Sequence, residues 1–412
     1  MKKIIKLIIT LIFIGLIGIS VYYFVSNKNK ETTDLNNITY IKKHYNKFVK
    51  TNKESILYDK NNKEIGKINK DINIKLDETN IDKDTTVFKI SGLDFYIKYQ
   101  DVDPVEEFVN DDSYKRYIPF NSNVTTTDKT ILYNDSGYVY EINTSIDLPI
   151  IIKDKDKYYV SYNDELLYVK KSEVKTKDNK NSSEATRDDI RVLTYHAVYK
   201  DGEECKNKAI CEKYDMFESQ IKYLADNNYI ALTMSELEMF LDKKINIPKK
   251  SIVITLDDGN LAKNAVEVLD KYKINATYFI ITDRYEEALS VPTKYVDYQS
   301  HTNDLHNNYK CPGGEQGGQL LCEKEDKVKK DLQTSREKIQ KHQEGEVFAL
   351  SYPFFDWNDR AIRLLKESGY RLAFIGEWDN GGMNNYNTNR LLLHRKTIFA
   401  EDSLETFKSY LN

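Results

Sequence analysis

Two adjacent carboxylates and two nearby histidines are the residues of this 412-residue chain whose types and spacing best suit metal chemistry. Asp257 and Asp258 follow the apolar run 251–256, and adjacent carboxylates repel each other unless a positive charge lies near them. His301 and His306 are five positions apart, so we expect them on a turn rather than on one face of a helix. One carboxylate and two imidazoles bind zinc in hydrolases and iron(II) in oxygenases, and the second, free carboxylate favours hydrolysis.

Other polar side chains follow further predicted strands in the C-terminal half of the chain. His196, Pro353-Phe354 and His394 each come after such a strand, and four of the six histidines lie at or just after strand ends. Chemistry in parallel β/α folds collects at the C-terminal ends of the strands. We therefore expect these side chains to share one site, in which His196 lines the cavity or makes a structural hydrogen bond.

The elements that must position these residues alternate in type from Ile190 onward. We predict strands at 191–195, 251–256, 276–281, 296–300, 347–352 and 372–375, and helices at 216–227, 324–342 and 359–368. Ser235 and Glu238 are predicted to form the capping box of one more helix. This alternation indicates a mostly parallel sheet or barrel.

These segments resemble the motifs of the polysaccharide deacetylases, carbohydrate esterase family 4. Ile254–Gly259 is similar to that family's Thr-Phe-Asp-Asp-Gly motif, and Ser300–His306 resembles its second, metal-binding motif. The five-residue histidine spacing is like that of poly-N-acetylglucosamine exopolysaccharide deacetylases, and Tyr352-Pro353-Phe354 resembles part of the third motif. The resemblance covers about residues 190–412. It implies a distorted (β/α) barrel and metal-dependent removal of N-acetyl groups from glycans.

The resemblance also implies roles for the site residues. Asp258, His301 and His306 would bind a divalent metal, with Zn2+ favoured, and Asp257 would be the general base that takes a proton from the attacking water. The backbone N–H of Phe354 would help to hold the oxyanion. The remaining members of the expected site are a general acid, His394, and the substrate-side residues Tyr352, Pro353, His196 and Trp378. For His394 an ordinary, partly buried histidine is an equally good interpretation, and for the aromatic residues so is core packing.

The sequence departs from the family pattern at three places. The family's arginine, five residues before the proline of the third motif, is Phe348 here, and the Asp-x-x-Asp-Trp motif is represented only by Trp378-Asp379. Arg395 follows His394 where the usual motif has an acid. We expect Arg395 to supply the missing positive charge beside Asp257.

A repeat in the N-terminal half predicts two small all-β domains. Ile56-Leu57-Tyr58-Asp59 returns as Ile131-Leu132-Tyr133-Asn134, and Phe95–Lys98 returns as Leu167–Lys170. Short alternating runs broken by Asn, Asp and Gly indicate antiparallel strands. The pattern resembles tandem bacterial SH3-type barrels, which could bind a wall polymer or serve as a passive stalk.

The N-terminus predicts a membrane location. Residues 7–25 are long and apolar enough to cross a bilayer, and Lys2, Lys3 and Lys6 precede them, so the N-terminus is expected in the cytoplasm. A cleaved signal peptide is the alternative. In either case the body of the chain faces the outside of the cell.

The four cysteines fit an exported protein, because disulfides form outside the cytoplasm. Cys205 and Cys211 lie six apart and Cys311 and Cys322 eleven apart, and neither spacing is that of a zinc ribbon. Three pairings are possible in principle. We favour the two local ones, with free buried thiols as the alternative.

The net charge of −4 argues against nucleic acid as the main partner. Residues 1–30 hold five lysines and no acidic residue, so the rest of the chain is acidic.

The expected organisation comprises a signal-anchor transmembrane helix at 1–27, a spacer at 28–50, SH3-like domains at 51–110 and 125–176, a linker at 177–189 and a catalytic domain at 190–412. The predicted function is a single-pass membrane protein whose extracellular α/β domain deacetylates the N-acetylglucosamine of peptidoglycan. The alternatives are a poly-N-acetylglucosamine exopolysaccharide deacetylase and a non-catalytic wall-binding protein.

Overall fold

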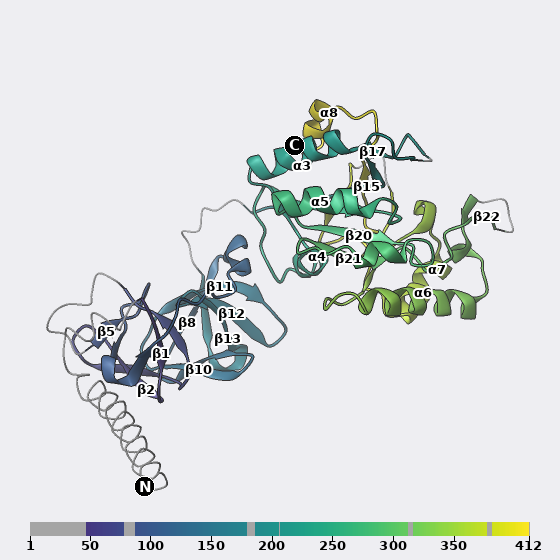
Figure 1. The fold of residues 1–412 in the computed structure, drawn as a ribbon. Coiled ribbons are helices and arrows are strands. Elements are labelled where there is room, and N and C mark those ends of the chain that lie inside the picture. The colour runs from purple at the N-terminus through teal and green to yellow at the C-terminus, as the bar shows by residue number, and fades with distance from the viewer. Residues whose placement is uncertain are drawn as a thin grey trace, which may run out of the picture. The chain divides into compact units, whose positions relative to one another are not determined.

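The computed structural model describes residues 47–77, 87–178, 186–205, 207–311, 316–376 and 381–411. The chain divides into two compact units, one formed by residues 1–114 and 120–181 and the other by 115–119 and 182–412 (Figure 1). The anchor predicted at 1–27 and the predicted site residue Trp378 lie outside the described residues. Among the helices that the structure describes, none is long and apolar enough to cross a membrane.

The first unit is built almost entirely from short antiparallel strands around one hydrophobic core. Its first half contains β1 (Phe48–Thr51), β2 (Ser55–Tyr58), β3 (Glu64–Ile68), β4 (Asn73–Lys75), β5 (Val87–Lys89), β6 (Tyr96–Lys98) and β7 (Val102–Pro104). Its second half contains β8 (Ser122–Thr125), β9 (Thr130–Asn134), β10 (Gly137–Ile142), β11 (Asp147–Lys153), β12 (Lys157–Tyr162), β13 (Glu165–Lys170) and β14 (Lys175–Asp178).

The two halves of this unit repeat each other in strand pairing. β1 lies between β4 and β7, as β8 lies between β11 and β14. Thr51 accepts a hydrogen bond from the N–H of Ile72 at 2.9 Å, and Thr126 accepts one from the N–H of Ile146 at 2.9 Å. The internal repeat predicted from the sequence is therefore present in the structure. β3 pairs with β10, so both halves share one sheet and one core, whereas the SH3-like character and the division into two domains stay predictions.

Two predicted boundaries were wrong. The spacer at 28–50 overlaps β1, and the linker at 177–189 overlaps both β14 and the first residue of the strand that starts at Asp189. All four side chains of β14 are exposed, so its sequence is as polar as a linker. Backbone pairing with β8, rather than side-chain burial, makes it a strand.

The second unit has the mixed α/β character that the sequence predicted, with a largely parallel sheet. Its path runs β25-β24-β21-β20-β19-β15-β26, with two short strands, β18 and β27, pairing on β19 and β15. These strands are β15 (Asp189–Tyr195), β18 (Ile230–Ala231), β19 (Ser251–Leu256), β20 (Ala276–Ile280), β21 (Val296–Ser300), β24 (Ala349–Ser351), β25 (Leu372–Phe374), β26 (Met383–Asn385) and β27 (Lys396–Thr397). β19 is buried along its whole length, as expected of a central parallel strand.

Helices pack on this sheet in two groups: α3 (Tyr214–Asp226), α5 (Ala262–Tyr272) and α8 (Leu404–Ser409) in one, and α6 (Glu325–Gln340) and α7 (Asp359–Glu367) in the other (Figure 1). The remaining helix, α4 (Met234–Leu241), begins two residues earlier than its predicted capping box requires. Thr233, not Ser235, is the N-cap, and its partner is Glu236 rather than Glu238. Both patterns place a hydroxyl three residues before a glutamate, so the sequence alone did not separate them.

The segment 390–398 lies between β25 and β15. Leu393 exchanges hydrogen bonds with Ala373 and Ile375 on one side, and Ile398 donates to the carbonyl of Thr194 on the other. The sequence predicted a strand directly before His394, and the structure places a single bridge there, between Phe374 and Leu393. This segment carries His394 and Arg395 to the C-terminal ends of the parallel strands.

Candidate active site

The two adjacent carboxylates sit on a tight turn at the end of β19. The N–H of Asp257 still bonds the carbonyl of Tyr195, and the chain then turns through Asp258 at φ 75° and Gly259 at φ 106°. A Cβ on Gly259 would lie 2.9 Å from the Cβ of Tyr285, so only glycine fits there. Asp258 adopts a left-handed conformation that is uncommon outside glycine, as residues at functional sites often do.

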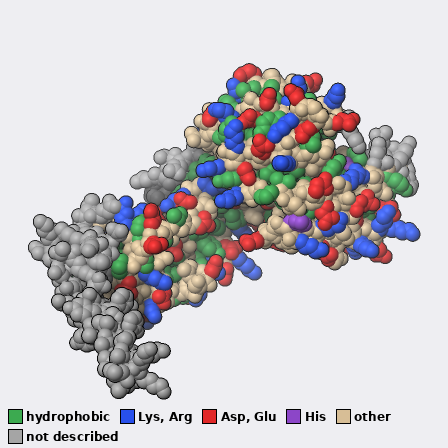
Figure 2. Space-filling view, viewed as in Figure 1, with side chains coloured by type: hydrophobic (Ala, Val, Ile, Leu, Met, Phe, Trp, Pro, Cys, Tyr) green, Lys and Arg blue, Asp and Glu red, His purple; other side chains and the backbone are tan. Residues whose placement is uncertain are grey.

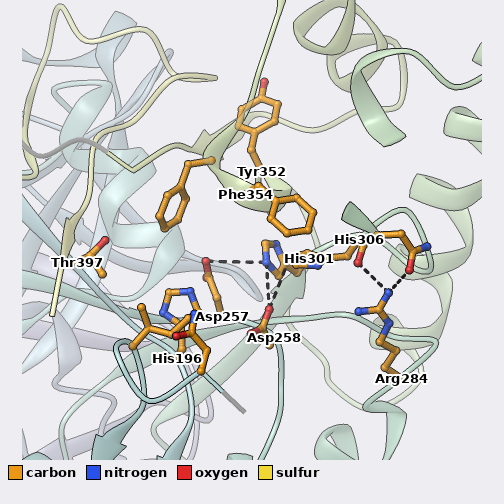
Figure 3. Close-up of a pocket in the computed structure, with 13 residues that line it drawn as sticks. His196, Asp257, Asp258, Arg284, His301, His306, Tyr352, Phe354 and Thr397 are labelled. Carbon is orange, nitrogen blue, oxygen red and sulfur yellow. Dashed lines mark hydrogen bonds and ion pairs between the residues drawn. The ribbon is translucent and has the colours of Figure 1, made fainter. Parts of the chain in front are cut away.

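Asp258, His301 and His306 form a three-donor cluster. The Oδ1 of Asp258 lies 3.5 Å from the Nε2 of His301 and 3.6 Å from the Nε2 of His306. All three donor atoms lie within 4.8 Å of one another. Figure 3 shows both imidazoles directed at the carboxylate. The structure therefore brings together the three residues expected to hold a metal.

The donor separations suit a small divalent cation. Donors at about 2.1 Å from a tetrahedral zinc ion lie about 3.4 Å apart, close to the separations found here. The Nδ1 of His301 lies 2.8 Å from the carbonyl oxygen of Ser351, which can only accept, so we assign the proton to Nδ1. Nε2 is then unprotonated and free to bind a cation, the arrangement usual for histidine ligands.

Electrostatics differ between the two histidines. Burial, followed by the neighbouring charge of His301, lowers the pKa of His306 to about 4, so His306 is neutral near pH 7. Burial also acts to lower the pKa of His301, but the carboxylates of Asp257 and Asp258 outweigh it and raise that pKa. A bound cation would replace the proton between these charges.

Asp257 is paired with Arg395. The Nη1 and Nη2 atoms of Arg395 donate to Oδ1 and Oδ2 of Asp257, both at 2.8 Å, and the hydroxyl of Ser351 donates to Oδ2 at 2.9 Å. Burial opposes the charge on Asp257, but Arg395 and His301 together hold its pKa well below its usual range. The sequence analysis expected a positive charge from Arg395 at this carboxylate, and the structure places it there.

Arg395 is itself 0% exposed and lies among aromatic rings. Its guanidinium carbon is 5.2 to 5.8 Å from the ring centres of Phe279, Phe355 and Phe374. Phe348, at the position of the family's usual arginine, is also buried and packs under Arg371 at 4.2 Å. An always-charged, planar side chain can keep its charge in such a place when it is paired bidentately.

A cavity of about 630 Å³ opens over these carboxylates and histidines. Its walls are His196, Asn207, Ile210, Asp257, Asp258, Arg284, His301, His306, Asn307, Tyr352, Phe354, Phe355 and Thr397 (Figure 3). Arg284 donates to the carbonyl of His306 at 2.7 Å, which ties the rim to the second histidine. This volume is typical of a small-molecule or single-sugar site.

Of the remaining predicted site residues that the structure describes, some line the cavity and the others do not. His196, Tyr352 and Phe354 line the cavity, and Phe354 is 44% exposed with its ring 4.6 Å from that of His306. Tyr352 is fully buried, which does not suit stacking on a sugar ring, and Pro353 is also buried. His394, the predicted general acid, is absent from the residues that line the cavity, whereas His196 is a wall residue.

Both expected disulfides are formed, and the first closes a segment that lines this cavity. Cys205 is joined to Cys211, and the loop between them supplies the wall residues Asn207 and Ile210. Cys311 is joined to Cys322. Sequence reasoning named the pairs but missed Asn207, Ile210 and Arg284, because loop residues far from any motif carry no local signal.

The chain belongs to the polysaccharide deacetylase family. Residues 244–373 match the Polysaccharide deacetylase family. A poly-beta-1,6-N-acetyl-D-glucosamine N-deacetylase of Staphylococcus aureus is 30% identical over 44% of this chain and 70% of its own length, and that of Staphylococcus epidermidis is 29% identical over the same shares. The solved structure of IcaB from Ammonifex degensii is 22% identical, covers 56% of this chain and 99% of that one, and has a TM-score of 0.46.

Proposed function

We propose that this protein is a metal-dependent N-deacetylase of a poly-N-acetylglucosamine exopolysaccharide. The observation that carries the activity is the pairing of a three-donor cluster, Asp258, His301 and His306, with a separate carboxylate, Asp257, in one cavity. The substrate is inferred from the names of the staphylococcal relatives, which act on poly-beta-1,6-N-acetyl-D-glucosamine. They favour the exopolysaccharide over peptidoglycan, which the sequence analysis had placed first.

In this proposal Asp258, His301 and His306 would hold the metal, taken to be Zn2+, which would supply Lewis-acid activation of water and of the acetamide carbonyl. Asp257, ionised and held by Arg395, accepts the proton of the attacking water. The N–H of Phe354 is the proposed donor to the oxyanion, because Phe354 lines the cavity beside His306. Its half-exposed ring offers an apolar face to a sugar.

We propose His196 as the group that protonates the leaving amine, in place of His394. His196 is the one imidazole of the described cavity wall that does not belong to the donor cluster. A general acid must come within hydrogen-bond reach of the nitrogen it protonates, so a residue outside the cavity is a poor candidate.

We further propose the finer features of architecture and location that the sequence suggested. The segment 390–398 would close the sheet into a distorted barrel by lying between β25 and β15. The apolar run 7–25 would hold the chain in the cell membrane with the catalytic unit outside, where both disulfides are stable.

Acetate release from defined glycans tests this function. Poly-β-1,6-N-acetylglucosamine and peptidoglycan would be assayed in parallel with the full chain, with and without a chelator, and with Asp257→Asn as the inactive control. We expect zinc-dependent acetate release from the exopolysaccharide. Release from peptidoglycan alone would overturn the substrate, and no release from either glycan with zinc present would favour a wall-binding protein without catalysis.

A further inference from the structure

Helix α6 turns one polar face toward the loop that carries both histidines. Asp331, Ser335 and Lys338 are spaced i, i+4 and i+7, so they lie on the same side of the helix. The sequence of α6 is mostly charged, yet Asp331 is only 8% exposed and Ser335 is fully buried. Most long charged helices expose such side chains, so this burial calls for a physical reason.

Asp331 receives two backbone hydrogen bonds from the turn between His301 and His306. Its Oδ1 accepts the N–H of Asn303 and its Oδ2 accepts the N–H of Asp304, both at 2.8 Å. Hydrogen bonds to an ionised acceptor are among the stronger ones in proteins. One carboxylate therefore fixes two successive peptide groups halfway between the two candidate ligands.

The other members of this face hold the flanks of the same loop. The hydroxyl of Ser335 lies 2.8 Å from that of Ser300, which in turn accepts the N–H of Thr302 at 3.1 Å. Lys338 donates to the carbonyl of Thr282 at 3.3 Å. Thr282 donates to the side chain of Asn303 at 3.0 Å.

The loop needs such support because regular secondary structure ends before it. β21 stops at Ser300, and Thr302 adopts a left-handed φ of 71° that a β-branched residue rarely takes. His306 must nevertheless return to within 3.6 Å of Asp258. A short shift of residues 303–304 would carry His306 out of reach of a shared cation.

We propose that Asp331 is a positioning residue for the metal site, holding the 303–304 backbone so that His301 and His306 face one ion. The proposal rests on the metal site of the proposed function but not on its substrate. It assigns a role in metal affinity to a residue on a different element from every candidate ligand. Asp331 touches neither the ion site nor the cavity wall, so it acts only through the loop.

Metal affinity of the full chain tests this role. Zinc binding would be measured by competition with a chromophoric chelator for wild type, Asp331→Ala and Asp331→Asn. We expect binding about tenfold weaker or more, the range found when groups that orient metal ligands are removed. Asp331→Asn keeps the shape of the side chain but exchanges one acceptor for a donor, so it serves if the alanine variant does not fold.

The matched control is Asp326, an exposed carboxylate on the first turn of the same helix. Asp326→Ala should leave zinc affinity unchanged, and the visible spectrum of the cobalt-loaded protein should change only in the Asp331 variants. A zinc Kd within about twofold of wild type in a folded Asp331 variant would overturn the proposal. Wild-type protein that bound no divalent cation would overturn the metal site as well, so the two failures are distinguishable.

Discussion

Replacing Arg395 by methionine removes the positive charge that holds the candidate base. Arg395 is 0% exposed and its guanidinium makes three hydrogen bonds of 2.8 Å, two to the carboxylate of Asp257 and one to the hydroxyl of Ser351. Methionine fills a similar volume among the surrounding rings. The substitution therefore tests charge and hydrogen bonding rather than packing.

The expected loss of stability follows from the burial of the pair. Removing one partner of a buried ion pair costs about 3–5 kcal/mol, because the other charge stays buried without compensation. At roughly 2–4 °C per kcal/mol for a unit of this size, the midpoint of thermal unfolding should fall by about 10 °C. Arg390→Met, on the same segment, is the control. Arg390 is partly exposed, lies 3.6 Å from Asp242 and donates to the carbonyls of Leu241 and Thr388, so its loss should cost less than the loss of the buried Arg395.

The lowered pKa of Asp257 sets the direction in which both stability and activity change with pH. The pKa of Asp257 is lowered in the folded protein, so its pairing stabilises the fold above the ordinary carboxylate range and is lost as the pH falls through the lowered value. Burial raises the pKa of Asp257 and the charge of Arg395 lowers it, so the pKa should rise when Arg395 is removed. The acid limb of the pH–rate profile should then move to higher pH.

Thermal unfolding and acetate release across pH, measured on Arg395→Met and on the double variant Asp257→Asn/Arg395→Met, check both expectations. The double variant should recover part of the lost stability, because the uncompensated charge is gone. An unchanged pH–rate profile together with an unfolding midpoint like that of Arg390→Met would refute this account of Arg395.

Three further expectations concern other parts of the second unit. His196→Ala should lower kcat by about 10²-fold or more while leaving zinc content intact, and His394→Ala should stay near wild type; the reverse order would return the general acid to His394. His301→Ala should lose stoichiometric zinc measured by elemental analysis, whereas His342→Ala, at an exposed position after α6, should keep it. Replacing Cys311 and Cys322 by alanine should lower stability by about 2–3 kcal/mol, seen as a lower unfolding midpoint, because the disulfide closes a short loop; an unchanged midpoint would contradict this.

The centre of the site could be predicted because its signals are local in sequence. Strands β19 and β21 have the predicted bounds, and Asp258 and His301, which lie two residues and one residue beyond them, meet as the ends of parallel strands do. The visible surface also carries acidic and basic side chains interspersed (Figure 2).

The sequence could not show that His196 lines the cavity and that His394 does not. Arg395 pairs with Asp257, whereas His394, the residue before it, is not among the residues that line the cavity. Which side chain of this segment reaches Asp257 depends on how residues 390–398 pair with β25 and β15. These are contacts between residues far apart in the sequence. Asp331 was missed for a related reason, since a buried carboxylate on a charged helix has the same sequence pattern as an exposed one.

The end of β24 explains how the base stays paired although Phe348 replaces the family's arginine. Ser351 donates its hydroxyl to Asp257 and accepts from Arg395, while its carbonyl accepts from His301. One buried residue thus fixes both the base and a candidate metal ligand, and it lies between β21 and β25. Asp257 and this hydroxyl need a guanidinium that contacts both of them. The side chain that supplies it does not have to lie on β24. Arg395, on segment 390–398, supplies this guanidinium. Position 348, where the family has its arginine, can therefore hold a buried phenylalanine.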